Sequence, residues 1–171
     1  AGIFTEFMEQ RAPGHTVLDG KIYAKGLRDF KSDIARETAK LDFLNDPAAY
    51  EKQEALKSFD LSCDALMLFA ERHADLAREQ AAKEARPQRR AELLKIAEVC
   101  SHVPAHAPRD FHEALQYYWF CHLAVITELN GWDSFNPGHL DQHLFPFYER
   151  GLAEGTLTRE SARELLECFF I

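Results

Sequence analysis

The sequence predicts a mainly α-helical protein. Apolar residues recur at the 3.6-residue period of an amphipathic helix over most of the chain. Capping residues and prolines divide this pattern into separate helices. No stretch shows the regular alternation of a clear strand, and only residues 117–120 and 168–171 are ambiguous between strand and helix.

The first helix is expected over Lys21–Leu44, where six apolar residues follow the helical period (Ile22, Leu27, Phe30, Ile34, Leu41 and Leu44). Asn45, Asp46 and Pro47 interrupt the pattern. Asp46 is a suitable N-cap, and Pro47 suits the first helical position, because an N–H group there would have no partner within the helix. A second helix is therefore expected to begin at this point.

This second helix is expected to run to about Ala85, with a break near residues 58–62. Pro87 ends it, because the residue before a proline is disfavoured in the α conformation. A third helix should cover Gln88 to about Ser101, and it should end before the next proline in the sequence.

A capping box marks the start of the next helix. Asp110 can accept a hydrogen bond from the first turn, and Glu113, three residues later, can reach back. The stretch Leu115–Leu129 is apolar almost all round, so this helix should be packed on every side. A short helix is expected near Leu140–Gly151, and Thr158 should cap a last one after a glycine break.

The composition indicates a globular protein of one domain. Of the 171 residues, 46% are hydrophobic and 28% are charged, which is the balance of an ordinary folded protein. Acidic and basic residues are interspersed and the net charge is −8, so neither nucleic acid nor an anionic membrane is an expected partner. The longest apolar stretches fall short of the ~20 residues of a membrane-spanning helix. Because the sequence starts without Met and stops within an apolar run, we expect both ends to be cut from a longer chain.

Neither the cysteines nor the histidines form a familiar metal or nucleophile motif. The cysteines are far apart beside apolar residues, so we expect reduced, buried thiols (Cys63, Cys100, Cys121 and Cys168). Two histidine pairs at i, i+4 spacing lack the intervening glutamate of the zinc-protease motif (His102 with His106, and His139 with His143). No Gly-x-Ser-x-Gly motif or phosphate-binding glycine-rich loop occurs. We therefore expect neither a metal site nor a catalytic residue in this chain.

Two loops carry polar and aromatic residues that helix formation does not require. The first, residues 10–19, presents Arg11, His15 and Asp19 on a turn that proline and glycine fix. This turn could hold a substrate oxygen or carboxylate, because arginine offers a planar fork of donors and histidine can donate or accept. Alternatively, it is a surface turn in which Arg11 pairs with Asp19 and His15 is solvated.

The second loop, residues 132–138, combines two hydrogen-bonding residues, Ser134 and Asn136, with the aromatic residues Trp132 and Phe135. It is either part of a binding site or a structural turn that its aromatic side chains anchor. The residue types alone leave both alternatives open.

Three separated segments are more distinctive: RAPGHTVLDGKIY at residues 11–23, FHEALQYYWF at 111–120 and NPGHLDQHLFPFY at 136–148. In this order they resemble segments of the pyruvate formate-lyase-like glycyl radical enzymes. The resemblance spans nearly the whole chain. It implies that residues 1–171 are part of a single pyruvate formate-lyase-like domain, within an enzyme whose ten-stranded α/β barrel is surrounded by helices.

In this group an activating enzyme, which uses S-adenosylmethionine and an iron-sulfur cluster, installs a radical on a backbone glycine. The radical passes to the cysteine of a Cys-x-Glu loop, and the thiyl radical abstracts hydrogen from the substrate. None of the four cysteines here precedes x-Glu, and no Arg-Val-x-Gly-Tyr-type radical loop occurs, so this segment alone should be inactive and bind no cofactor. For the full-length protein, the resemblance implies a cytoplasmic homodimer of anaerobic metabolism, with a small-molecule substrate and the activating enzyme as partners.

The resemblance assigns part of the substrate pocket to this chain. By match to diol dehydratases, His15 would hydrogen-bond a substrate hydroxyl, and Ser134 would contact a substrate oxygen. By match to arylacetate decarboxylases, Phe4 and Ser134 would contact the ring and the carboxylate. Arg11 lies where an anion-binding arginine would suit an isethionate-type lyase.

Four positions depart from the patterns of the group. Trp132 and Asp133 are expected to line the pocket, and they differ from the smaller or uncharged residues of diol dehydratases. Pro-Gly-His139 stands where many members have Pro-Gly-Arg, and Asp-Gln-His143 stands where they have Asp-Gln-Tyr. The subclass, and with it the substrate, stays open at this point.

We therefore expect a segment of a glycyl radical lyase, of the dehydratase or decarboxylase type. Its substrate would be small and hydroxylated, anionic or arylacetic, and the reaction would proceed through a thiyl radical. The alternative is a stand-alone helical interaction module without enzymatic activity, with residues 110–129 as its binding core.

Overall fold

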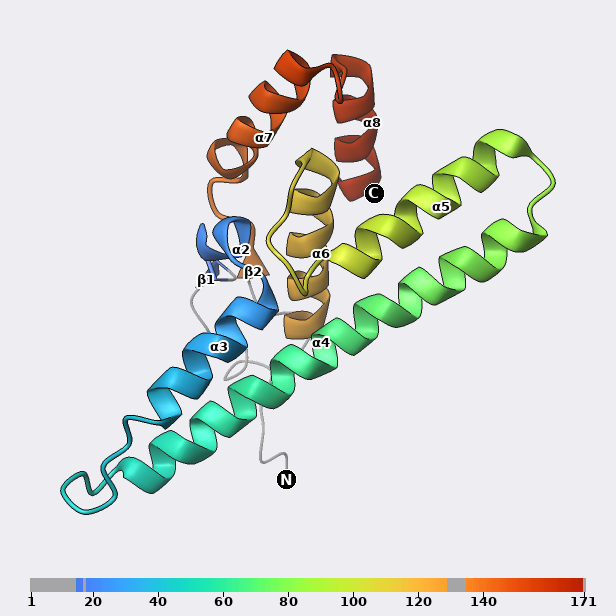
Figure 1. Ribbon diagram of the computed structural model, residues 1–171. Helices are drawn as coiled ribbons and strands as arrows, with labels where there is room; N and C mark the ends of the chain where they lie inside the picture. Colours follow the sequence, from blue (N-terminus) through green and yellow to red (C-terminus); the bar gives the residue numbers. More distant parts are fainter. Residues whose placement is uncertain (1–14, 17, 129–134, 171) are drawn as a thin grey trace, which may run out of the picture. The chain divides into compact units, whose positions relative to one another are not determined.

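The computed structural model describes residues 15–16, 18–128 and 135–170 (Figure 1). Helices dominate this part of the chain, which confirms the predicted mainly α class. Two compact units are present. One comprises residues 25–107 and is called the inserted unit here, because in sequence it lies between the two parts of the other, residues 1–24 and 108–171, which we call the core unit.

The inserted unit consists of α3 (Leu27–Thr38), α4 (Ala49–Lys83) and α5 (Pro87–His102). α4 contacts both of the other helices, and α5 runs back along it (Figure 1). Four buried alanines form one stripe on α4, at intervals of three or four residues (Ala70, Ala74, Ala77 and Ala81). Their short side chains allow a second helix to approach closely.

The prediction of one helix over residues 21–44 is wrong. α2 (Lys21–Ala24) ends before α3 begins, and the break includes Gly26. A β-carbon on Gly26 would lie 2.5 Å from the carbonyl carbon of His106, and closer still to the α-carbon of His106 and the carbonyl oxygen of Ala105. Only glycine allows the backbone of this segment to approach so closely.

Two backbone hydrogen bonds hold the start of α3 against that distant segment. The Leu27 N–H donates to the carbonyl oxygen of Pro104 at 2.8 Å, and the Arg28 N–H donates to that of Ala105 at 3.1 Å. Both donors lie in the first turn of α3, where N–H groups have no partner within the helix. The bonds therefore satisfy two donors that the helix itself leaves open.

α4 begins later than predicted and shows no break. The Asp46 carboxylate accepts from the Ala48 N–H and the Asp46 carbonyl from the Ala49 N–H, each at 3.0 Å, so Asp46 forms a turn before the helix. Within the predicted break, the Ser62 hydroxyl donates to the Ser58 carbonyl at 2.9 Å. This bond satisfies the serine within the helix, which continues through the position.

The boundary between α4 and α5 follows the prediction. Arg86 is extended, with φ −80° and ψ 118°, and Pro87 lies in the first turn of α5. Both are the conformations that a proline imposes at the start of a helix. α5 ends at His102, one residue beyond the predicted end.

The core unit is built around α6 (Phe111–Glu128), which contacts α2, α7 (Leu140–Glu154) and α8 (Arg159–Phe170). Its apolar core draws on α6, α7 and α8 (Phe111, Ala114, Leu115, Leu144, Phe147 and Ala162). The prediction that this helix is packed on every side is confirmed only for its first half, where all residues but Trp119 are buried or half-buried. Residues 122–126 are half-buried, and Thr127 is exposed.

The connection between α7 and α8 also follows the prediction. Gly155 has a left-handed conformation with φ 69°, which ends α7 at little steric cost. The Thr158 hydroxyl oxygen accepts from the Ser161 N–H at 3.0 Å, so Thr158 caps α8.

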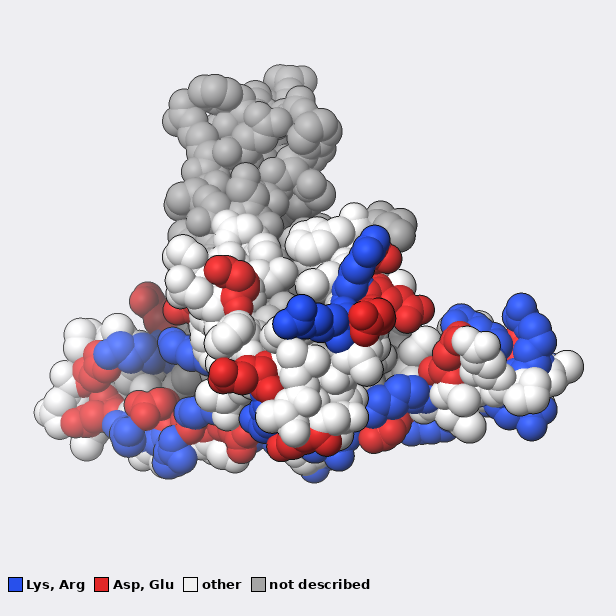
Figure 2. Space-filling view, turned by 90° about the horizontal axis from the view of Figure 1, so that it is seen from above, with Lys and Arg blue, Asp and Glu red and all other residues white. Residues whose placement is uncertain are grey.

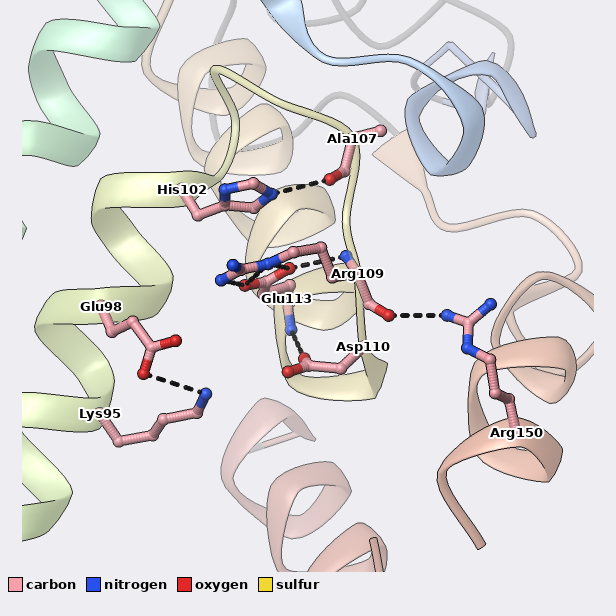
Figure 3. A network of polar contacts seen from close by, with 8 residues as sticks. All are labelled: Lys95, Glu98, His102, Ala107, Arg109, Asp110, Glu113 and Arg150. Carbon is pink, nitrogen blue, oxygen red and sulfur yellow. Dashed lines mark hydrogen bonds and ion pairs between the residues drawn. The ribbon is translucent and has the colours of Figure 1, made fainter. Parts of the chain in front are cut away.

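An ion pair between a buried carboxylate and a half-exposed guanidinium lies at the start of α6 (Figure 3). The Glu113 carboxylate is completely buried and accepts from the Arg109 N–H at 2.6 Å and from Arg109 Nε at 3.0 Å. Asp110 accepts from the Glu113 N–H at 2.8 Å, and Arg150 Nη2 donates to the Arg109 carbonyl at 2.7 Å. The predicted capping interactions are thus present, with Glu113 reaching back to residue 109.

Charges of both signs are mixed on the surface. Figure 2 shows acidic and basic side chains side by side over the visible face. Many are i, i+3 or i, i+4 ion pairs along single helices, such as Lys57 with Glu54 and Arg163 with Glu167. Among the described residues, no helix combines the length and the apolar composition that crossing a bilayer requires.

Candidate functional site

Two short parallel strands join the two loops that the sequence singles out. In β1 (His15–Thr16) and β2 (Phe135–Asn136), His15 lies opposite Phe135 and Thr16 opposite Asn136. The expectation of no strand is therefore wrong for these four residues, because a two-residue strand is too short to show alternation. The pairing places the backbones of residues 15–16 and 135–136 side by side.

Of the five predicted pocket residues, His15 lies in the described part of the chain, on β1. The other four lie outside the described residues (Phe4, Arg11, Trp132 and Ser134). Ser134 directly precedes Phe135 in sequence, and Phe135 is the strand partner of His15. The structure thus pairs the backbone of His15 with that of Phe135, and the position of Ser134 lies outside the described residues.

The turn after β1 has an unusual backbone. Leu18 and Asp19 are both left-handed, with φ 55° and 49°. Asp19 Oδ1 lies 3.2 Å from His143 Nε2 on α7, which is within ion-pair distance, although the angle is not that of a hydrogen bond. The alternative pairing of Asp19 with Arg11 involves a residue outside the described part. The contact with His143 was not predicted, because nothing in the local pattern links the two positions.

The His143 ring is packed against α2. It stacks on the Tyr23 ring with centroids 5.0 Å apart and planes inclined by 21°. A β-carbon on Gly20 would lie 3.4 Å from His143 Cε1, so the turn itself lies against the imidazole. The Tyr23 hydroxyl is buried without a hydrogen-bond partner among the described residues, and burial raises the pKa of Tyr23 above its usual range.

In each histidine pair of the sequence, at least one imidazole contacts other protein groups. His143 faces Tyr23 and Asp19, and its backbone N–H donates to the His139 carbonyl at 3.0 Å. His102 lies 3.0 Å from the Ala107 carbonyl and stacks on His106 (Figure 3 shows the first contact). Over residues 15–16, 18–128 and 135–170, no three potential ligands gather as a metal site.

Comparison with known proteins identifies the family. The sequence matches the family described as pyruvate formate lyase-like over residues 1–171. The chain belongs to this family. Its predicted resemblance to the pyruvate formate-lyase-like glycyl radical enzymes is confirmed.

Three relatives show how this family member compares with others. The trans-4-hydroxy-L-proline dehydratase of Clostridioides difficile is 53% identical over 171 residues, 100% of this chain and 22% of that enzyme. Its crystal structure with substrate bound matches 96% of this chain and 21% of its own, with a TM-score of 0.90. Isethionate sulfite-lyase of Nitratidesulfovibrio vulgaris is 41% identical over 88% of this chain and 18% of its own length.

The third relative is the B12-independent glycerol dehydratase of Clostridium butyricum, whose glycerol-bound structure is 32% identical with a TM-score of 0.82. The match covers 91% of this chain and 19% of that enzyme. The chain thus spans about a fifth of the length of these pyruvate formate lyase-like relatives.

The cysteines of this family member differ in exposure. Cys100 and Cys121 are buried, as expected, whereas Cys63 is half-buried and Cys168 is exposed. Burial raises the pKa of Cys100 to about 11, which keeps its thiol protonated and unreactive at neutral pH. None of the four cysteines is followed, two positions later, by the glutamate of a Cys-x-Glu loop.

A groove of about 550 Å³ lies among α6, α7 and α8 of the core unit. Aromatic and aliphatic side chains form most of its lining, with Asp141, Arg159 and Arg163 among them. The predicted pocket residues Phe4, Arg11, Trp132 and Ser134 lie outside the described residues, so they are not compared with this lining.

His122 on α6 should make stability depend on pH. Its Nδ1 lies 3.0 Å from the Tyr118 hydroxyl, and burial lowers the pKa of His122 below its ordinary value near 6.5. The unfolded state therefore binds a proton more readily, so this contribution to stability is present above about pH 6.5 and is lost as the pH falls. His122→Gln should flatten the fall in unfolding free energy between about pH 7 and pH 5. Equal slopes in wild type and variant would contradict this assignment.

Proposed function

We propose that this chain forms part of the substrate pocket of a glycyl radical dehydratase that removes water from a small hydroxylated amino acid. Trans-4-hydroxy-L-proline is the first candidate substrate. The observation that carries the proposal is the 53% identity to the dehydratase of that compound over the whole chain. Identity to the isethionate lyase is lower and covers less of the chain.

The residues of the two loops suit the chemistry of such a substrate. A hydroxy amino acid presents a hydroxyl, a carboxylate and an ammonium group. His15 and Ser134 can hydrogen-bond the hydroxyl, Arg11 can bind the carboxylate through its planar fork, and Asp133 can pair with the ammonium group. Apolar walls come from the remaining predicted residues (Phe4 and Trp132).

The parallel pairing of β1 and β2 supports an enclosed site. Parallel neighbours require a long crossover connection, and helices fill the sequence between these two strands. Parallel strands covered by helices are the building principle of α/β barrels, whose loops commonly form active sites. Such an enclosure would exclude water and oxygen from a radical, while a few polar groups orient the reacting atom.

The radical chemistry itself would lie in other parts of the full-length protein. We propose that it carries a glycyl radical, which an S-adenosylmethionine-dependent activating enzyme installs, and a cysteine that abstracts hydrogen from the substrate. We also propose that the full-length protein is a cytoplasmic homodimer of anaerobic metabolism. Within the present chain, the contribution is to bind and orient the substrate.

The decisive experiment uses the full-length protein, activated without oxygen and monitored by electron paramagnetic resonance. Trans-4-hydroxy-L-proline, glycerol and isethionate are then supplied separately. Loss of water from hydroxyproline, detected by mass spectrometry, would support the proposal. Release of sulfite from isethionate would instead support an isethionate-type lyase, a second candidate that Arg11 and the 41% identity favour. A stable glycyl radical with no turnover of hydroxyproline would contradict the assignment of this substrate, and loss of water from glycerol instead would support a diol dehydratase.

His15→Ala and Ser134→Ala should each lower kcat/KM by roughly tenfold or more without reducing the glycyl radical signal. An unpaired polar group in a closed pocket costs about 1–3 kcal/mol, which corresponds to this loss. Matched controls are His73→Ala and Ser32→Ala in the inserted unit, which make the same truncations outside the paired loops. Wild-type kinetics in both pocket variants would remove the pocket assignment.

A further inference from the structure

The connections that follow β1 and β2 meet a second time beyond the strands. β1 continues through Asp19 into α2, and β2 continues through Gly138 into α7, which carries His143. Asp19 Oδ1 and His143 Nε2 lie 3.2 Å apart. The same two connections are thus joined by backbone pairing at the strands and by a side-chain contact just after them.

The turn that carries Asp19 is strained. Two consecutive residues, Leu18 and Asp19, have φ values of 55° and 49°. Such conformations are costly for residues other than glycine and persist only where the surrounding structure imposes them. Aspartate tolerates the left-handed region better than leucine does, because its short polar side chain can interact locally. The His143 imidazole, whose Nε2 lies within ion-pair distance of the Asp19 carboxylate, is one group that could impose this constraint.

His143 provides a fixed point for that contact. Its side chain is only 20% exposed, whereas the Asp19 side chain is 71% exposed. One face of the imidazole stacks on Tyr23, whose ring also lies 6.3 Å from the ring of Phe147 in the apolar core. The side of Gly20 that would carry a β-carbon faces the imidazole edge. The imidazole is therefore held by the core, and the turn rests on it.

We propose that Asp19 and His143 form a clamp that fixes the register of β1 against β2 and thereby positions His15. They are positioning residues, since their effect on a substrate would pass through the strand pair. A shift of one residue in a strand turns every side chain to the opposite face, so register decides which way His15 points. The kinetic part of this inference rests on the proposed function, whereas its structural part stands independently.

Two substitutions in the full-length protein test the clamp directly. Asp19→Asn keeps the size and the tolerance of a left-handed backbone but removes the charge, and His143→Phe keeps an aromatic ring against Tyr23 but removes Nε2. Hydrogen–deuterium exchange of the β1 and β2 amides should become several-fold faster in each variant. The double variant should exchange no faster than either single one, because both remove the same contact.

Asp141→Asn is the matched control, since it removes an exposed carboxylate from the same helix two residues before His143. Exchange at the strands should stay at the wild-type rate in this control. Wild-type exchange in both clamp variants would overturn the inference. So would exchange in the double variant that equals the combined effects of the single ones.

A kinetic measurement separates positioning from a merely structural role. Asp19→Asn should lower kcat/KM by about tenfold, mainly through KM, with an unchanged glycyl radical signal. In a His15→Ala background, the same substitution should have no further effect, because the residue that it positions is gone. Independent, multiplicative losses would overturn the positioning role. If the wild-type protein does not act on hydroxyproline, the proposed function fails, while the exchange measurement still decides the clamp.

Discussion

Gly26→Ala should lower the unfolding free energy of the inserted unit by about 3 kcal/mol or more. The new β-carbon would overlap with backbone atoms of Ala105 and His106, which cannot rotate away as a side chain could. Overpacking of this kind costs about 1–3 kcal/mol. Separating the two segments would also break the hydrogen bonds of Leu27 and Arg28, each of which contributes about 1 kcal/mol.

Gly155→Ala is the matched control for this substitution. Gly155 has a left-handed backbone with φ 69°, but a β-carbon there would meet no atom within 4 Å. The expected loss is about 1 kcal/mol, from backbone strain alone. Chemical denaturation compares the two variants, and faster amide exchange at Leu27 and Arg28 should appear only in Gly26→Ala. Equal stability of the two variants would contradict the role of close packing at Gly26.

Arg109→Ala should destabilise the core unit by about 3 kcal/mol. The substitution leaves the completely buried Glu113 carboxylate without the guanidinium that donates to it. Removing one partner of a buried ion pair costs about 3–5 kcal/mol. The lower end of this range applies because the Arg109 side chain is 55% exposed. The stability of Arg109→Lys should lie between those of wild type and Arg109→Ala, since lysine keeps the charge but lacks the planar fork of donors.

Arg163→Ala tests whether burial, rather than pairing, decides the effect. Arg163 and Glu167 are also four residues apart on a helix, with Nε and Oε1 separated by 2.7 Å, but both are exposed. Exposed pairs contribute little, so thermal unfolding of this variant should resemble wild type. A loss as large as that of Arg109→Ala would show that burial of Glu113 is not the cause.

Features that depend on neighbouring residues were predictable from the sequence. Three such features are the cap at Thr158, the helix start at Pro87 and the interaction of Asp110 with Glu113. Each involves residues that are no more than four positions apart in the sequence. Their physical causes, which are capping of free N–H groups and the fixed φ of proline, act over one helical turn. Local pattern therefore contained the necessary information.

Features that depend on distant residues were not predictable. The break at Gly26 results from a segment around His106, and the period of apolar residues continues through it. The strand pair joins residues 15–16 to 135–136 and is too short to leave an alternating pattern. The contact of Asp19 with His143 has the same origin. In each case tertiary approach, rather than local preference, decides the conformation.

The candidate site was predictable only in outline. Residue types singled out the two loops but left an alternative for each, because polar residues are also common on turns. For the first loop this was a surface turn, which the residue types favoured, and for the second it was a structural turn anchored by aromatic side chains. The resemblance of three segments to glycyl radical enzymes favours the pocket interpretation, which stays a prediction. The family match over residues 1–171 then confirmed the resemblance.

The hydrogen bonds from Leu27 to Pro104 and from Arg28 to Ala105 also bear on how this protein can change during evolution. They join residues near the two ends of the inserted unit, so that these ends lie next to each other. An insertion whose ends are adjacent can lengthen, shorten or be exchanged without altering the spacing that the rest of the chain must span. The far end of the α4–α5 hairpin is thus free to diverge among homologues, while Gly26 and the segment at 104–106 should be retained.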